Sequence, residues 1–403
     1  MKGLRPRCVF VTEPSLAELA LSDPEQRFRK ARLPTSLRWL VGDGTAASGL
    51  PAEVETRWDG LRAEKRAAIL PALAPPSREA VLDVVEPKLA FMPGQPFDAF
   101  ALLYDVFFGL AWRLLFRREE SPEVMRACRG LRTSALAASQ ALRGWHSHFA
   151  PYLDRSLRAD PAWWQLLPGS RRTTLLARQR SLGVLSHEML RDDASDVARL
   201  DLASLIRAWA RHLDGVNPED AARFAGVGLL LASFENSASV AAWLLWLLAR
   251  HPEWSERQVC SREDTIPFQN CLNEALRLFP PVWSVERETR RDFQWKGQDF
   301  QAGTIFLISP WVQGRLRSCW DEPNRFLPDR WAGPQPAPGL FLPFGLGRRS
   351  CPGASFACQE IEIVLGLLLE RYRFEAVAER PAPVPLFGIT QRPRSVWLRA
   401  WLR

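Results

Sequence analysis

The chain has 403 residues, of which 47% are hydrophobic and 24% are charged, as in a globular protein with a large core. Its formal net charge of +8 suits an acidic protein partner or an anionic cofactor. Nucleic-acid binding is disfavoured, because the sequence has no zinc-finger spacing and no Lys/Arg block with interleaved aromatic residues.

The seven cysteines are scattered and form no CxxC pair. This pattern argues against a disulfide framework and predicts reduced thiols in the cytoplasm. Residues 1–20 carry charge and proline throughout, so they resemble neither a signal peptide nor a membrane anchor. We therefore expect a soluble cytoplasmic protein.

The first half of the chain predicts mainly helices. Residues 8–12 form a short β-type run, after which Glu13 begins a helical pattern that reaches Leu21. Residues 31–58 mix proline, glycine and serine and predict an irregular loop. Helical periodicity then predicts helices at about residues 62–73, 77–91, 97–117, 122–153, 173–192 and 200–213.

The second half contains the longest helical pattern, residues 218–250, which is apolar around most of its circumference and predicts a buried helix. Residues 274–278 lie on a further helix, and the shorter periodicity of residues 283–310 predicts a small antiparallel sheet. A proline-rich segment, residues 323–343, leads to a last helix at about 354–371 and a strand-like tail. The elements predict a mainly α fold with a minor β part.

A glycine-rich stretch precedes the last predicted helix and contains Cys351. A thiolate binds metal when a helix N-terminus and nearby cations lower the pKa of its thiol. Gly345, Gly347 and Gly353 allow the backbone to approach a flat ligand closely and to adopt positive φ. The alternative is a turn ahead of a buried, inert cysteine, which is the more common role of a single free cysteine.

The complete run from Phe344 to Gly353, FGLGRRSCPG, resembles the haem-thiolate loop of the cytochromes P450, of the soluble bacterial type. The resemblance implies a cytochrome P450 fold over residues 1–403, a single domain with a long central helix over the haem and small antiparallel sheets. It implies haem b as the cofactor, with Cys351 as the axial ligand of the iron and Phe344 and Gly353 beside the haem, and dioxygen as co-substrate.

Glu274 and Arg277 lie three residues apart on one face of a predicted helix. Taken alone, such a pair is more typical of a solvated surface. In its context it resembles the ExxR helix of the cytochromes P450, and Arg330 lies in a stretch that resembles the arginine motif that follows it. The resemblance implies that Glu274, Arg277 and Arg330 form a buried charge network that supports the haem loop.

Haem carries two propionates, so its pocket needs cations. By resemblance, Arg62 and Arg66 lie on one face of a helix that reaches a propionate, Arg287 matches an arginine of the sheet, and Arg349 matches the cation of the loop. The alternative is an ordinary basic surface, because the chain contains 53 Lys and Arg residues.

The long helix contains Ala232, which by resemblance lies against the oxygen-binding face of the haem. In the family an acid followed by a threonine relays protons there, as general acid catalysis requires. Glu235 keeps the acid, but Asn236 replaces the threonine, and an amide is not a proton-transfer acid near neutral pH. Ser237 offers a hydroxyl about 100° further round the helix. We expect Glu235, Asn236 and Ser237 to be the catalytic residues.

The resemblance also places four side chains where they would line a substrate pocket: Phe234, Trp283, Phe387 and Ile389. Such a pocket is apolar and aromatic, so it suits a hydrophobic or ring-bearing small molecule.

Three functions remain open. The first is a monooxygenase that oxidises a hydrophobic small molecule, in a role we place in secondary metabolism. The second is oxidative coupling or cyclisation of an aromatic natural product or peptide, which the replacement at Asn236 suggests. The third is a haem-binding protein without turnover.

Electrons must come from a separate partner, because the chain has no dinucleotide glycine fingerprint and no cluster cysteines. We expect a ferredoxin or flavodoxin with its reductase, attracted by a basic surface that includes Arg62, Arg66 and Arg348.

Residues 5–14 resemble the second sheet strand of the family, and the family's first strand and first helix have no counterpart before them. The sheet is then expected to have an uncovered edge, which favours association with other strands.

Overall fold

The computed structural model describes residues 8–23, 25–30, 76–89, 93–133, 169–191, 201–213, 217–260, 266–388 and 390–403. The chain divides into two compact units. Unit 1 comprises Met1–Arg32, Phe91–Phe100 and Ser239–Arg403, and unit 2 comprises Leu33–Ala90 and Ala101–Ala238. The single domain expected for residues 1–403 stays a prediction.

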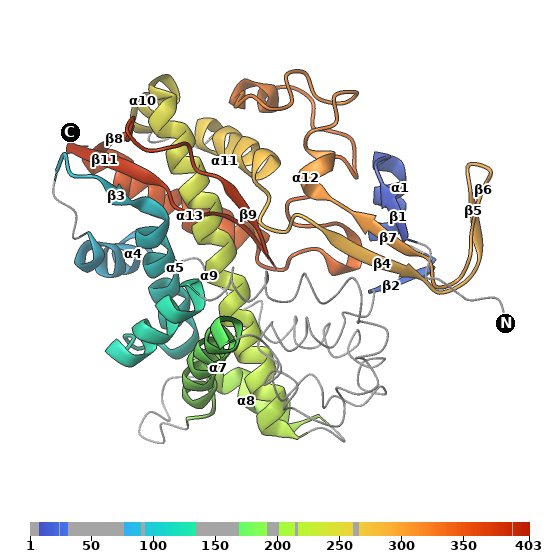
Figure 1. Ribbon diagram of the computed structural model, residues 1–403, viewed down its shortest axis with the longest axis horizontal. Coiled ribbons are helices and arrows are strands. Elements are labelled where there is room, and N and C mark those ends of the chain that lie inside the picture. Colours follow the sequence, from blue (N-terminus) through green and yellow to red (C-terminus); the bar gives the residue numbers. More distant parts are fainter. Residues whose placement is uncertain are drawn as a thin grey trace. The chain divides into compact units, whose positions relative to one another are not determined.

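The described strands all belong to unit 1 (Figure 1). They are β1 (Cys8–Val11), β2 (Phe28–Lys30), β3 (Phe97–Asp98), β4 (Val285–Thr289), β5 (Phe293–Trp295), β6 (Gln298–Phe300), β7 (Ile305–Ile308), β8 (Tyr372–Ala376), β9 (Pro385–Phe387), β10 (Gln391–Pro393) and β11 (Trp397–Leu402). Among the described residues they form a four-stranded sheet in the order β1-β7-β4-β2, a three-stranded sheet β3-β11-β8, and the pairs β9-β10 and β5-β6.

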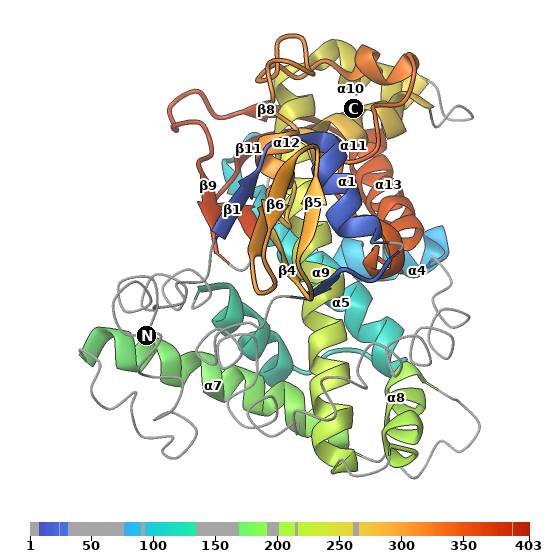
Figure 2. The ribbon, with the colours of Figure 1, turned by 90° about the vertical axis from the view of Figure 1, so that its right-hand side faces the viewer.

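The four-stranded sheet combines segments from both ends of the chain. The predicted antiparallel pairing within residues 283–310 is confirmed, since β4 pairs antiparallel with β7, and β5 with β6 in a hairpin (Figure 2). Sequence patterns did not predict that β1 adds to β7 in parallel, with Val11 opposite Ile308. Among the described residues β1 pairs only with β7, and its Phe10 is 50% exposed, as expected for an edge strand.

Helix α1 (Pro14–Ser22) covers this sheet. Its apolar residues, Leu16, Ala17, Ala20 and Leu21, join one buried cluster with residues of the sheet and with Leu342, just before the cysteine loop. The helix therefore connects the sheet to the loop that carries Cys351.

Unit 1 contains further helices besides α1. They are α10 (Pro252–Cys260), α11 (Ile266–Leu278), α12 (Pro310–Gln313) and α13 (Ala354–Arg371), with short 3-10 turns η4 (Pro328–Ala332) and η5 (Gly347–Arg349). Helix α13 has the bounds that its apolar periodicity predicted.

Unit 2 is helical in its described part. Its elements are α4 (Arg78–Val85), η2 (Glu86–Lys88), most of α5 (Ala99–Phe116), a helix over residues 122–133, α7 (Gly169–Leu190), α8 (Leu202–Arg211) and the first part of α9 (Pro218–Arg250). The sequence predicted the bounds of α9 correctly. The predicted loop at 31–58, the helix at 62–73 and the end of the helix at 122–153 lie outside the described residues.

Two described helices, α5 and α9, are long and apolar enough to cross a membrane by length and composition alone. However, 72% of the apolar window of α5 and 61% of that of α9 is buried inside the protein. Such burial is typical of core helices.

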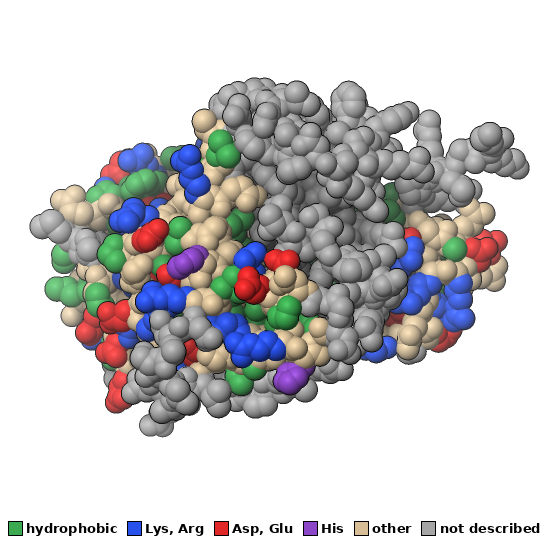
Figure 3. Space-filling model, turned by 90° about the horizontal axis from the view of Figure 1, so that it is seen from below, with side chains coloured by type: hydrophobic (Ala, Val, Ile, Leu, Met, Phe, Trp, Pro, Cys, Tyr) green, Lys and Arg blue, Asp and Glu red, His purple; other side chains and the backbone are tan. Residues whose placement is uncertain are grey.

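On the face shown in Figure 3, basic and acidic side chains are interspersed over the described surface, without a large patch of one sign.

Candidate functional site

Two backbone hydrogen bonds close the loop around Cys351 before α13 begins. The backbone N–H of Cys351 donates to the carbonyl of Phe344 at 2.8 Å, and that of Ser350 donates to Gly347 at 3.0 Å. Gly345 and Gly347 both have a φ of 69°, a conformation that a residue with a side chain rarely adopts. Gly353 was also expected to adopt a positive φ, but it is the N-cap of α13 and its φ is −96°.

Gly347 also lets the loop lie directly against the end of α1. A Cβ atom at this position would come within 2.6 Å of Ser22 Cα and 2.7 Å of the Leu21 carbonyl oxygen. No side chain fits there without moving backbone. The dependence of the cysteine loop on α1 was not predicted from the sequence, since the two segments lie at opposite ends of the chain.

The thiol of Cys351 is accessible, and open space lies beside it. Cys351 is exposed and forms no disulfide. A Cβ added to Gly353 would meet no atom within 4 Å, and one added to Gly345 would have its nearest neighbours at 3.9 Å. An accessible soft sulfur beside bare backbone fits a planar group with a thiolate ligand, such as haem. The alternative of a buried, inert cysteine does not describe Cys351.

Cys358 lies on α13, and the surroundings of its thiol differ from those of the Cys351 thiol. Its side chain is half-buried, and burial, followed by the neighbouring charge of Cys351, raises the pKa of its thiol to about 11. A thiol with a raised pKa remains protonated and does not bind metal. Of the two cysteines at this end of α13, Cys351 has the surroundings of a ligand.

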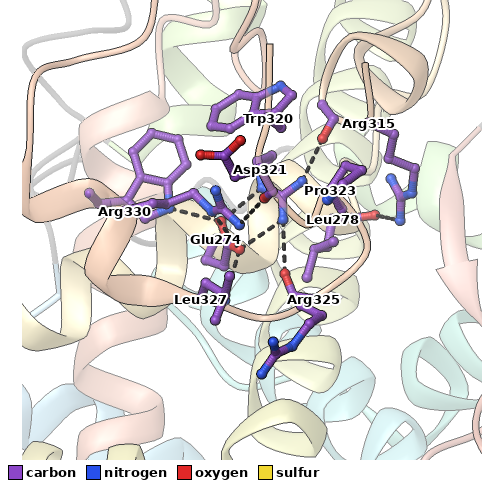
Figure 4. Close-up of polar contacts among 12 residues, drawn as sticks. Glu274, Leu278, Arg315, Trp320, Asp321, Pro323, Arg325, Leu327 and Arg330 are labelled. Atoms are coloured by element: carbon purple, nitrogen blue, oxygen red, sulfur yellow. Dashed lines mark hydrogen bonds and ion pairs between the residues drawn. The ribbon is translucent and has the colours of Figure 1, made fainter. Parts of the chain in front are cut away.

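Glu274 lies at the centre of a buried network of polar contacts (Figure 4). Its Oε1 accepts from Arg277 Nη2 at 2.8 Å, from the Leu327 backbone N–H at 2.9 Å and from Arg330 Nε at 3.1 Å. Its Oε2 accepts from Arg277 Nε at 2.8 Å and from Trp331 Nε1 at 3.0 Å. The structure thus brings together the three residues expected to form a network.

Arg277 uses its other N–H groups to hold the segment before the loop. Its Nη1 donates to the carbonyls of Gly314 at 2.5 Å and Pro323 at 2.7 Å, and its Nη2 donates to that of Arg325 at 3.1 Å. The side chains of Glu274 and Arg277 are both fully buried. A buried ion pair is tolerated only when its remaining donors are satisfied, as they are here.

Two tryptophans complete the network, and the sequence analysis assigned them no role. Trp331 donates to Glu274, as described above. The ring of Trp320 faces both arginines, with its centroid 5.1 Å from Arg277 Cζ and 5.7 Å from Arg330 Cζ, and its Nε1 donates to Gln313 O at 2.9 Å. Cations over an indole face are attracted by its quadrupole. The only sequence signal was a high tryptophan content between Cys319 and Ala332.

Arg315 is a half-buried arginine next to this network that sequence reasoning missed. It donates to the carbonyls of Leu278, the last residue of α11, and Trp311, and its guanidinium stacks on the Trp311 ring at 3.5 Å. Burial, followed by the charge of Arg277, lowers the pKa of Arg315 to about 10. A cation at a helix C-terminus is favourable, so Arg315 fixes the end of the helix that carries Glu274.

The cations expected to bind propionates have different surroundings. Arg287 is buried on β4, where its Nη1 donates to the Glu286 carbonyl at 2.9 Å. Arg349 is half-buried at the end of η5, two residues before Cys351. Arg62 and Arg66 lie outside the described residues. The roles of all four stay predictions.

The acid and amide segment of α9 belongs to unit 2. Asn236 Nδ2 donates to the Ala232 carbonyl at 3.0 Å, and the Ser237 hydroxyl donates to that of Ser233 at 3.0 Å. Asn236 Oδ1 is buried without a hydrogen-bond partner among the described residues. Glu235 is half-buried and makes no hydrogen bond or ion pair within the described part of the chain, whereas Ala232 is exposed.

Phe234 does not line open space in this structure. It is fully buried, and its ring packs edge-on against Tyr104 at 4.9 Å and Phe108 at 5.2 Å. Its ring is part of the core of unit 2, and its expected role in lining a substrate pocket stays a prediction.

Trp283 and Phe387 remain partly accessible in unit 1. Their rings pack edge-on at 5.4 Å, Phe387 also meets Trp311 at 4.9 Å, and Trp283 Nε1 donates to the Gly388 carbonyl at 3.0 Å. These contacts hold the β9–β10 hairpin in place. Ile389 lies outside the described residues.

Known proteins resemble this chain in sequence and in fold. Residues 218–397 match the family model Cytochrome P450. Cytochrome P450 81Q32 of Catharanthus roseus is 35% identical over 167 residues, which cover 38% of this chain and 34% of that protein. Bovine (Bos taurus) lanosterol 14-alpha demethylase is 31% identical over 170 residues, covering 38% and 34%. The chain thus spans about a third of the length of these curated relatives.

Solved structures resemble the chain over nearly its whole length. A six-coordinate cytochrome P450 from Thermus thermophilus has a TM-score of 0.68 at 24% identity and covers 97% of this chain and 92% of its own. The retinoic-acid-bound cyanobacterial CYP120A1 has a TM-score of 0.74 at 20% identity, with 98% and 89% covered. At these identities the likeness shows the fold, which is the mainly α fold expected from the sequence.

Proposed function

Because the chain belongs to the cytochrome P450 superfamily, we propose that it is a cytoplasmic haem-thiolate oxidoreductase that oxidises a hydrophobic small molecule. The observation that carries the proposal is the accessible thiol of Cys351 in a loop held from two sides. Gly347 abuts the end of α1 on one side, and the Glu274 network holds the preceding segment on the other. The free thiols among the described cysteines support the cytoplasmic location.

Cys351 would hold the iron of haem b, and Arg349 and Arg287 would pair with its propionates. When bound, a thiolate-ligated haem supplies two-electron activation of dioxygen. The role of the protein chain is to keep the sulfur of Cys351 in place, and its hydrogen bonds support this role. Arg277 holds three backbone carbonyls of the segment that leads to the loop, so a shift of this segment would leave donors of a buried arginine unpaired.

Proton delivery depends on Glu235, Asn236 and Ser237. Glu235 is half-buried and is the acid of this segment, so it is the proposed proton donor. Asn236 Nδ2 donates one hydrogen bond and the Ser237 hydroxyl donates its hydrogen bond to helix carbonyls. Asn236 Oδ1 is left as an acceptor for water or for a donor group of the substrate.

The amide at position 236 and the engaged hydroxyl of Ser237 favour a second candidate, the oxidative coupling or cyclisation of an aromatic substrate. Coupling inserts no oxygen atom from dioxygen into the product, whereas hydroxylation inserts one. Reaction under labelled dioxygen separates the two, because hydroxylation retains the label. Consumption of reducing equivalents that depends on substrate excludes a haem-binding protein without turnover.

The absorption spectrum of the reduced protein with carbon monoxide tests the proposal. We expect the strongly red-shifted Soret band of a thiolate-ligated haem, and its loss in Cys351→Ala. Cys358→Ala is the matched control, because it removes the neighbouring thiol of α13 and leaves the proposed ligand. A red-shifted band that survives Cys351→Ala would refute the assignment.

Electrons would come from a ferredoxin or flavodoxin with its reductase. Arg348, exposed in the loop three residues before Cys351, is the described member of the basic surface that would attract such an acidic partner. Contacts between exposed charges are screened by salt. Reduction rates that do not fall with rising salt would contradict an electrostatic partner surface.

A further inference from the structure

A cavity of about 280 Å³ lies in unit 1, away from the cysteine loop. It is bounded by the C-terminal turns of α9 and α11 and by residues 324–326. None of the residues proposed to hold haem, electrons or protons lines it. A cavity of about 150 Å³ accepts benzene, so this one has room for two fused rings with a substituent.

The apolar part of the cavity lining, called its floor below, is mainly aromatic. Trp246, Phe279 and Phe326 line it, together with Leu247 and Leu278. The rings are held by neighbours outside the cavity: Trp243 meets Trp246 edge-on at 5.9 Å and stacks on Phe279 at 3.8 Å. Rigid rings of this kind bind flat apolar ligands with little loss of entropy.

The polar part of the cavity lining, called its rim below, is basic. It consists of Arg250, His251, Asn324 and Arg325. Two of these have an acidic neighbour, since His251 Nδ1 lies 3.4 Å from Glu253 and Arg325 lies 2.5 Å from Glu322. Among the described residues, no carboxylate lines the cavity itself.

Arg250 is the rim cation without a counterion in the described part of the chain. Its guanidinium contacts only an aromatic face there, that of Trp246, at 5.3 Å from the centroid. Its five N–H donors are therefore available to a planar anion, which a guanidinium binds in a bidentate manner. Asn324 adds a second donor at the rim.

We propose that this cavity is an accessory binding site for a small aromatic carboxylate, whose ring lies between Trp246, Phe279 and Phe326 and whose carboxylate pairs with Arg250. The site is separate from the proposed haem site, and its chemistry does not depend on that function.

The accessory site touches the Glu274 network through one loop. Arg325 presents its backbone oxygen to Arg277 and directs its guanidinium away from Glu274 (Figure 4). Phe326, the next residue, lines the cavity. A ligand that orders this loop also stabilises the acceptors of Arg277, so binding should raise the thermal unfolding temperature.

Isothermal titration calorimetry of the full-length protein with 1-naphthoate and with 1-naphthalenemethanol tests the proposal. The two probes share the ring system, and only the first carries a charge. We expect the native protein to bind the carboxylate about tenfold or more tightly than the alcohol, because a charge-assisted hydrogen bond is strong. In Arg250→Gln the two affinities should become similar.

Arg257→Gln is the matched control. Arg257 lies over the Trp254 ring at 4.6 Å, much as Arg250 lies over Trp246, but it does not line the cavity. The preference for the carboxylate should survive this change. Trp246→Leu should weaken both probes, because both use the ring floor.

Two results would overturn the proposal. One is the absence of binding heat for 1-naphthoate at about 1 mM. The other is a preference for the carboxylate that is the same in Arg250→Gln as in the native protein. Neither result bears on the haem-thiolate assignment, which depends on the spectrum of Cys351 variants.

Discussion

Glu274→Gln should strongly destabilise the protein although it keeps the shape of the side chain. The carboxylate has 0% exposure and accepts hydrogen bonds on both oxygens. An amide keeps one acceptor, so its oxygen can replace Oε1 towards Arg277, Leu327 and Arg330. Its NH₂ group would then face Arg277 Nε and Trp331 Nε1, which are both donors.

The size of the destabilisation follows from the buried charge that the substitution leaves unpaired. Arg277 loses its buried counterion, and breaking a buried pair from one side typically costs about 3–5 kcal/mol. Glu322→Gln is the matched control, because Glu322 pairs with Arg325 at 2.5 Å on the same segment but is 54% exposed. An exposed pair contributes only about 0–1 kcal/mol.

Urea unfolding followed by circular dichroism measures both variants, and absorbance measures how much haem each retains. We expect Glu274→Gln to lower the free energy of unfolding by about 3–5 kcal/mol and to reduce haem loading. Glu322→Gln should change neither by a comparable amount. Equal stabilities for the two variants would refute the view that Glu274 holds the segment leading to the loop.

Two further changes test other parts of the site. Gly314→Ala should lower the free energy of unfolding by about 1–3 kcal/mol, because a Cβ would lie 2.5 Å from the Arg277 carbonyl oxygen and 3.2 Å from its Cγ. Gly333→Ala, whose Cβ meets only an oxygen at 3.8 Å, is its control in the same unfolding assay, and equal losses would contradict the steric argument. Burial raises the pKa of Glu360 to about 8 from a model-peptide value of 4.5. The folded state then holds a proton that the unfolded state releases, so stability falls as pH rises from about 4.5 to 8. Glu360→Gln should flatten this fall and raise stability at pH 8, and an unchanged pH profile would show that Glu360 does not cause it.

Local patterns predicted much of the helical part of the fold. The bounds of α9 and α13 agree with the expected ranges because helical periodicity and terminating residues act within a few turns. The cysteine loop was found in the same way, since its glycines and Cys351 are adjacent in sequence. Its φ values confirm the need for glycine at 345 and 347 but not at 353.

These local patterns could not predict contacts between segments that are distant in the sequence. No local signal shows that β1 pairs in parallel with β7, or that Gly347 must be bare because α1 ends against it. Trp331, Trp320 and Arg315 were missed for the same reason, because their roles depend on which distant groups they contact.

The sequence by itself determined the residue types that this chemistry needs: a cysteine in a glycine-rich turn, an acid and an arginine one helical turn apart, and an amide where a hydroxyl is expected. The tertiary structure decided what those residues can do. Burial made Glu274 and Arg277 a satisfied ion pair rather than a surface pair, and packing left Cys351 accessible while enclosing Phe234. The physical reason is that exposure, hydrogen-bond partners and close approach are properties of the folded chain, and residues far apart in sequence supply them.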